Sequence, residues 1–188
     1  MARDIVIGMA GSGGDGIVSA GDSLLSAAAL EGFHTMMTKS FGPQIRGGES
    51  SCRVRLSNEP LLNPGSMLDI AVALNWDDFM KFGAELPCGP ETVVVYEAKT
   101  GVAEGALPLK GVTPAQVFSV PLGELTKTAA GTDKAKNSLV LGILSGWIGV
   151  GREGVPHGIR ARFGKKGDEV VRQNLKAFAA GLAFAEAN

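Results

Sequence analysis

The stretch that decides the fold is "DIVIGMAGSGGDGIVSAGDSLLSAAALEG" (residues 4–32). Its apolar run around Val6 predicts a buried strand over residues 4–9. A glycine-rich loop follows, and the small and apolar residues from Gly16 to Leu30 then predict a helix that stops at Gly32. A strand, a glycine loop and a helix in this order are typical of proteins with a parallel sheet.

The rest of the chain continues the alternation of strands and helices. Further strands are predicted at residues 35–40, 51–57, 69–75, 91–97 and 118–120. Asn75 is the expected cap of a short helix that follows it, and residues 133–149 and 168–187 are expected to be helical. This pattern predicts an α/β fold, a Rossmann-like three-layer sandwich with a mostly parallel sheet, in a single domain over residues 1–188.

Composition excludes several classes of function. A formal net charge of -1 gives no basic field for a nucleic acid partner. We expect no membrane insertion and a cytoplasmic location, because no apolar run approaches the length of a membrane span and no basic-then-apolar leader opens the chain. Cys52 and Cys88 stand far apart, so no metal site and no cysteine-ligated iron–sulfur cluster is expected from this chain alone.

The glycine loop supports more than one interpretation. Gly11, Gly13 and Gly16 satisfy G-x-G-x-x-G, in which backbone N–H groups approach a phosphate at a helix N-terminus. A dinucleotide site has an acidic residue at the end of the second strand, but Lys39 stands there. A basic residue at this position could accept the extra phosphate of NADP, so an independent NADP-binding reductase is one alternative. A nucleotide-binding regulatory module is another, and a purely structural turn is a third. Ile17 occupies the position of the phosphate-binding lysine of a Walker loop, which excludes that motif.

The loop also mimics part of a thiamine diphosphate motif. "GGDG" (residues 13–16) matches its Gly-Asp-Gly, whose Asp binds the magnesium of the diphosphate. The motif also needs an Asn ligand downstream, and "MMTKSFGPQIRGG" (residues 36–48) offers none. We therefore expect this chain alone to bind no thiamine diphosphate.

Four segments together resemble the gamma subunit of the 2-oxoacid:acceptor (ferredoxin) oxidoreductases, whose pyruvate, 2-oxoglutarate, indolepyruvate and phenylglyoxylate types share this domain. The glycine loop with its small-residue helix is the first. "RGGESSCRVRLS" (residues 46–57) is similar to the family's Arg-Gly-Gly-x-Ser strand. "NPGSMLDIAVALN" (residues 63–75) resembles its Pro–Asp strand, and "KNSLVLGILSG" (residues 136–146) its Asn–Leu-Gly helix. The resemblance covers most of residues 4–185.

The resemblance implies a division of labour in a complex that oxidatively decarboxylates a 2-oxoacid to an acyl-CoA. This chain is then a non-catalytic gamma subunit that docks to the thiamine diphosphate subunits and helps to bind coenzyme A. Partners would be the alpha, beta and ferredoxin-like delta subunits. They would carry thiamine diphosphate with Mg, the iron–sulfur clusters and, in some relatives, FAD. The sequence names neither the 2-oxoacid nor the electron acceptor.

The glycine loop, the neighbouring strand end and the turn before residue 50, taken with this resemblance, give the candidate site residues. Those expected to face coenzyme A are Gly11, Ser12, Gly13, Gly14, Asp15, Gly16, Lys39, Ser40 and Asn137, and those expected at a subunit interface are Arg46, Gly47 and Gly48. Asp15 departs from the Gln usual in gamma subunits, although single-chain pyruvate oxidoreductases carry Asp in a related motif. Asn137 could instead satisfy neighbouring backbone groups, and His157 is expected in a loop after Pro156.

Overall fold

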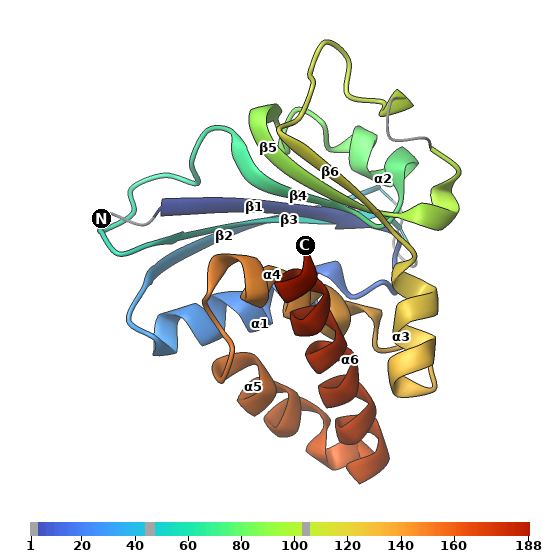
Figure 1. Cartoon of the computed structure of the whole chain (residues 1–188). Coiled ribbons are helices and arrows are strands. Elements are labelled where there is room, and N and C mark those ends of the chain that lie inside the picture. The colour runs from blue at the N-terminus through green and yellow to red at the C-terminus, as the bar shows by residue number, and fades with distance from the viewer. Residues whose placement is uncertain (1–3, 44–47, 103–105) are drawn as a thin grey trace. The chain divides into compact units, whose positions relative to one another are not determined.

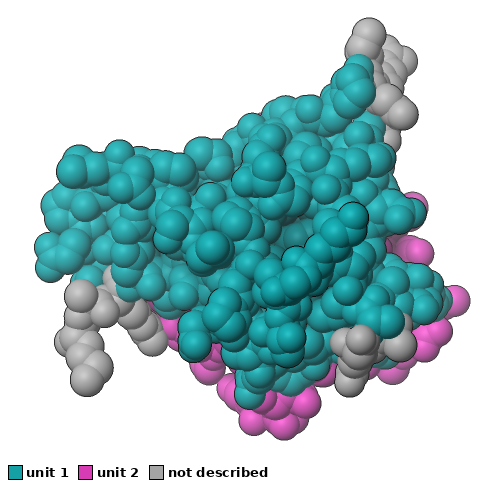
Figure 2. Space-filling model, turned by 90° about the horizontal axis from the view of Figure 1, so that it is seen from above, with its two compact units in different colours: residues 1–21, 33–121 teal, residues 22–32, 122–188 magenta. Residues whose placement is uncertain are grey.

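The computed structural model describes residues 4–43, 48–102 and 106–188, which fall into two compact units. Unit 1 covers residues 1–21 and 33–121, and unit 2 covers residues 22–32 and 122–188 (Figure 2). The sheet belongs to unit 1, whereas the C-terminal helices belong to unit 2. The expectation of a single domain over residues 1–188 stays a prediction.

Unit 1 is built on a six-stranded sheet in the order β2-β3-β1-β4-β5-β6 (Figure 1). The strands are β1 (Asp4–Gly11), β2 (His34–Phe41), β3 (Ser50–Ser57), β4 (Leu68–Ala73), β5 (Cys88–Glu97) and β6 (Gln116–Val120). β1, β4, β5 and β6 pair in parallel, while β3 is antiparallel to both β1 and β2. Among these six strands, β3 alone therefore runs against the others. The predicted α/β fold with a mostly parallel sheet is confirmed.

The β2–β3 hairpin fixes which residues share a face of the sheet. Lys39 is opposite Cys52, which in turn is opposite Met9, so these three side chains lie on one face. Ser40 lies one position along and therefore faces the other side. The N–H of Gly42 donates to the carbonyl of Glu49 at 2.9 Å and closes the hairpin beyond the last paired residues.

The first turns of α1 (Ile17–Leu30) approach the sheet closely within unit 1. A Cβ placed on Gly21 would lie 2.5 Å from Cε of Met37 and 2.8 Å from Sγ of Cys52, so the position needs glycine. Sγ of Cys52 also lies 3.6 Å from the carbonyl of Ile17. The face of the sheet that carries Lys39 is therefore the face on which α1 begins.

The opposite face of the sheet packs against α2 (Trp76–Lys81). The Trp76 ring lies 5.5 Å from both the Phe79 and the Tyr96 rings, and all three side chains are buried. Asn75 caps α2 as predicted, because its side chain accepts a hydrogen bond from the N–H of Asp78 at 3.1 Å. A 3-10 turn, η1 (Ala98–Thr100), follows β5.

Unit 2 contains residues 22–30 of α1 and the C-terminal helices. These are α3 (Leu122–Ala130), α4 (Lys136–Ile148), α5 (Gly154–Phe163), the 3-10 turn η3 (Gly164–Lys166) and α6 (Asp168–Ala187). Two glycines bring α4 and α6 together: a Cβ on Gly142 would lie 2.1 Å from the Phe178 carbonyl oxygen, and one on Gly181 would lie 2.1 Å from that of Leu139. Oγ of Ser138 donates to Oδ1 of Asn174 across the same contact at 2.7 Å.

Two helices of unit 2, α3 and α5, were not predicted from the sequence, and the placement of His157 in a loop is wrong. His157 lies in α5, and Pro156 does not break this helix because it is the third residue, where a backbone N–H would have no partner within the helix. Over the parts of the chain that the structure describes, no helix is long and apolar enough to cross a membrane.

Candidate functional site

The candidate site lies in unit 1, at the edge of the sheet where the parallel strands end. The loop of residues 11–16 follows β1, and Asn75 and the start of α2 follow its parallel neighbour β4. The carboxyl ends of parallel strands are the usual position of ligands in open α/β sheets. The glycine loop and the N-terminus of α2 therefore meet where a ligand is expected.

Within the loop, glycine is required at two positions and one carboxylate folds back onto the backbone. Gly14 and Gly16 have φ of 98° and 69°, which favour glycine. Oδ2 of Asp15 accepts a hydrogen bond from the N–H of Ser12 at 2.9 Å, and the N–H of Asp15 donates to the Ser12 carbonyl at 3.0 Å. The loop is thus closed around Ser12 by Asp15, and the amide of Ser12 is already engaged.

A second carboxylate holds the Ser12 side chain. Oγ of Ser12 donates to Oδ2 of the buried Asp78 at 2.5 Å. Oδ1 of Asp78 accepts from Nζ of Lys81 at 3.2 Å, and the same ammonium lies 3.4 Å from Oε1 of Glu49. The hydrogen bond to Asp78, more than that to Glu49, raises the pKa of Lys81. This network runs from the loop through α2 to the segment before β3. Sequence reasoning missed it, although the acidic first turn of α2 is a signal that could have indicated it.

The tip of the loop is the part that can receive a ligand. Gly13 and Gly14 are exposed, and within the described residues their amides donate to no acceptor. The first turn of α1, which begins directly afterwards at Ile17, contains no acidic residue. Exposed amides at a helix N-terminus favour an anion, although the Asp15 carboxylate at the base of the loop opposes one.

Lys39 and Ser40 were both among the residues predicted to face the ligand, but they point to opposite faces of the sheet. Lys39 is exposed on the face where α1 begins, the face nearest the loop's helix. Ser40 hydrogen-bonds through its hydroxyl to the carboxylate of Glu85 on the other face. The structure therefore brings Lys39, but not Ser40, to the side of the sheet on which α1 begins.

The sheet order bears directly on the dinucleotide interpretation. In a dinucleotide-binding fold the second strand lies next to the first, so that its end meets the ribose beside the glycine loop. Here β3 is inserted between β1 and β2, which places β2 two strand spacings, about 10 Å, from β1. This arrangement counts against an NADP-dependent reductase, because Lys39 is displaced from the position that the ribose would occupy.

The remaining predicted residues lie elsewhere. Asn137 lies on α4 in unit 2, and its Oδ1 is buried without a hydrogen-bond partner in the described part of the chain, so this oxygen does not satisfy a neighbouring backbone group. Arg46 and Gly47 fall outside the described residues. Gly48 is half-buried, directly before Glu49 and β3.

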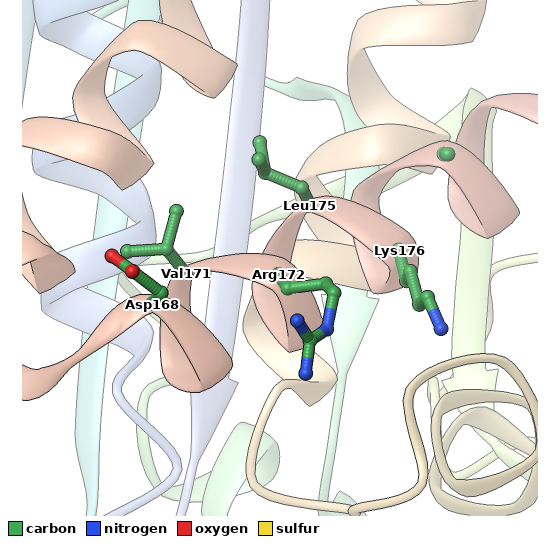
Figure 3. A pocket seen from close by; sticks show the side chains of 6 residues that line it. Asp168, Val171, Arg172, Leu175 and Lys176 are labelled. Atoms are coloured by element: carbon green, nitrogen blue, oxygen red, sulfur yellow. The ribbon is translucent and has the colours of Figure 1, made fainter.

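A hollow of about 480 Å³ on the surface of α6 is a poor ligand site. Its lining residues all come from this one helix, and in Figure 3 Val171 and Leu175 point to one side of it while Arg172 and Lys176 point to the other. Small-molecule sites are concave and bring several polar groups together.

Within residues 4–43, 48–102 and 106–188, no group of three or more His, Cys, Asp or Glu side chains could hold a metal ion.

Comparison with known proteins gives one consistent result. Residues 6–184 match the pyruvate ferredoxin/flavodoxin oxidoreductase family. The chain is 33% identical to the ketoisovalerate oxidoreductase subunit VorA of Methanothermobacter marburgensis, over 99% of this chain and 37% of that protein. It is 30% identical to the 2-oxoglutarate synthase subunit KorC of Archaeoglobus fulgidus, over 97% of this chain and 88% of that protein.

A solved structure agrees with these relatives. The 2-oxoglutarate:ferredoxin oxidoreductase from Magnetococcus marinus, with 2-oxoglutarate, coenzyme A and succinyl-CoA bound, superposes with a TM-score of 0.83 at 30% identity. The match covers 99% of this chain and 32% of that one. The chain thus spans about a third of the length of VorA and of the Magnetococcus marinus protein, but most of the length of KorC.

Proposed function

The chain belongs to the pyruvate ferredoxin/flavodoxin oxidoreductase family as a gamma-subunit domain of a 2-oxoacid:ferredoxin oxidoreductase, and from this we propose that it docks to the thiamine diphosphate subunits of such a complex and helps to bind coenzyme A. The observation that carries the proposal is the match of nearly the whole chain to an oxidoreductase structure that contains coenzyme A. Catalysis of the decarboxylation is assigned to partner subunits, which would hold thiamine diphosphate, Mg and iron–sulfur clusters. The alpha, beta and delta subunits are the proposed partners.

The geometry of unit 1 supports a role in binding coenzyme A rather than a dinucleotide. Coenzyme A carries a diphosphate and a separate phosphate on its ribose, so two distinct anionic groups need partners. The exposed amides of Gly13 and Gly14 suit one of them. Lys39 lies on the same face as the start of α1 but two strands from β1, at a position that suits the other.

Replacing Lys39 tests this assignment in the assembled enzyme. Loss of a charge-assisted phosphate contact costs about 1.5–3 kcal/mol, which corresponds to a roughly ten- to hundredfold weakening. Lys39→Ala should therefore raise the Michaelis constant for coenzyme A by about that factor and change the constant for the 2-oxoacid much less. Steady-state kinetics with each substrate varied in turn measures both.

The matched control is Lys110→Ala, which removes another exposed lysine of unit 1 away from the loop and should leave both constants unchanged. A Lys39→Ala enzyme with a wild-type dependence on coenzyme A would show that Lys39 does not contact coenzyme A and would contradict this assignment. Failure of the tagged wild-type chain to co-purify with thiamine diphosphate and iron–sulfur subunits would contradict the proposed membership of a complex.

A further inference from the structure

A strongly basic segment stands out on unit 2. Residues 152–166 contain five Lys or Arg residues against the single carboxylate of Glu153, a formal net charge of +4 in a chain whose total is -1. Arg160, Arg162, Lys165 and Lys166 are all exposed on α5 and η3. This concentration of charge creates a local positive potential that the composition of the whole chain conceals.

Some of these cations have no ion pair within the described residues, although Arg152 lies 3.3 Å from the Glu186 carboxylate. Within the described residues neither Arg160 nor Lys165 forms an ion pair. The ammonium of Lys166 lies 5.5 Å from the centre of the Phe163 ring and keeps its charge, while Arg162 lies 5.7 Å from the same ring and makes a further interaction. The segment therefore retains its capacity to attract carboxylates.

A groove of about 340 Å³ runs beside this segment, between residues 22–30 of α1 and α5, both in unit 2. At one end the helices touch, because a Cβ on Gly154 would lie 2.8 Å from Cβ of Ala27. Further along, a Cβ on Gly158 would meet nothing within 4 Å, so the groove is open there. The small side chains of Ser23 and Ser26 also line it, and small side chains permit close approach by another backbone.

The rim of the groove has both charged and apolar character. His157 and Arg162 line it from α5, and Asp22 is the one carboxylate among the lining residues of the described chain. Leu30, also on the rim, leaves 76% of its surface exposed. The lining of the groove thus combines charged groups, small side chains and one exposed apolar side chain.

We propose that this groove and the basic segment beside it form a docking surface for a carboxylate-rich peptide segment of another subunit of the same oxidoreductase, with an apolar side chain of that segment against Leu30. The proposal rests on the proposed function because it requires a partner subunit. Complementary charge would speed association and fix the orientation of the partner. A nucleic acid fits less well, because Phe163, the one Phe, Tyr or Trp side chain of α5 and η3, already lies under two cations.

The test uses the co-expressed complex with two variants of this chain. The first reverses four charges, Arg160→Glu with Arg162→Glu, Lys165→Glu and Lys166→Glu. The second, Gly158→Leu, fills the groove where the structure leaves open space. The control reverses the same number of charges on exposed lysines outside residues 152–166: Lys110→Glu with Lys127→Glu, Lys134→Glu and Lys176→Glu. Native mass spectrometry measures how much of each chain remains in the complex, and circular dichroism confirms that each is folded.

We expect both test variants to reduce retention at least tenfold and the control to retain the wild-type level. Backbone amides of residues 154–166 should exchange hydrogen more slowly in the wild-type complex than in the isolated chain, and rising salt should weaken retention. Wild-type retention of both test variants, without slower exchange, would overturn the inference and leave the proposed function intact. If the variant with four reversed charges assembles as the wild type does but no longer binds RNA or anionic vesicles, the inference is overturned. The basic segment would then bind one of these other polyanions. If the wild-type chain assembles with no partner, the proposed function fails, and this docking surface with it.

Discussion

At the scale of single residues, long-range contacts decide what a motif can do. The G-x-G-x-x-G spacing correctly located the loop, and glycine is needed where φ is positive at Gly14 and Gly16. It could not reveal that Ser12 is held by Asp78, because the two residues are 66 positions apart in the sequence. Strand alternation is enough to tell which face of the sheet carries Lys39. It does not tell how far β2 lies from β1.

Burial decides the chemistry of the two thiols. Cys52 and Cys88 are both buried, as is usual for small apolar groups. Desolvation raises the pKa of Cys88 to about 11, because the low-dielectric interior disfavours the thiolate. The thiolate is the reactive form, so Cys88 is inert at neutral pH.

We therefore expect no thiol of the native chain to react with an aromatic disulfide reagent at pH 8 within minutes, and both to react in guanidinium chloride. Because the native pKa of Cys88 is raised, its contribution to stability is present below the ordinary thiol pKa and is lost as the pH rises through about 11. Spectrophotometric thiol counting checks the first expectation, and thermal melts between pH 8 and 11 check the second. Rapid reaction of one thiol at pH 8 would show that its site opens readily.

At the scale of elements, local pattern predicted the strands well and some helices poorly. β1, β4 and β5 were found because continuous apolar runs are typical of buried parallel strands. The insertion of β3 between β1 and β2 could not be read from the sequence, since strand pairing is a long-range property. α5 was missed because Gly154, Pro156 and Gly158 give it weak helical propensity, and its helix is instead held by the burial of Val155 and Ile159.

Glycines in helices have opposite roles in α4 and α5. Gly142→Ala should destabilise the chain by about 3 kcal/mol, because the new methyl group would collide with the Phe178 carbonyl oxygen between α4 and α6. Gly158→Ala meets open space and should stabilise it by about 0.5–1 kcal/mol through improved helix propensity. Chemical denaturation of the two variants compares these changes directly. Equal midpoints would mean that α4 and α6 can separate at little cost.

At the scale of the whole molecule, the chain carries the scaffold of a ligand-binding fold. The carboxyl edge of its sheet carries a loop suited to an anion, while the carboxylates beside that loop are already engaged by Ser12 and Lys81. Five of its 18 Lys and Arg residues lie in residues 152–166 of unit 2, beside a single carboxylate in that segment. These properties suit a subunit that binds and positions others.

We expect the isolated chain to bind no thiamine diphosphate. The Gly-Asp-Gly of its loop lacks the downstream Asn ligand, and Asp15 directs one oxygen to the N–H of Ser12. Titration calorimetry with thiamine diphosphate and magnesium should show no saturable heat, whereas the assembled complex provides the positive control. Saturable binding at micromolar concentration by the chain alone would contradict this expectation.

The closure of the β2–β3 hairpin by Gly42 and Glu49 has a consequence for how this family can diversify. Because that hydrogen bond joins the two ends of residues 43–48, changes in the length of this segment need not alter the register of the sheet. Each doubling of a flexible loop costs only about 0.6 kcal/mol in closure entropy. Natural selection can therefore lengthen, shorten or rewrite these six positions while the paired strands β2 and β3 are inherited unaltered.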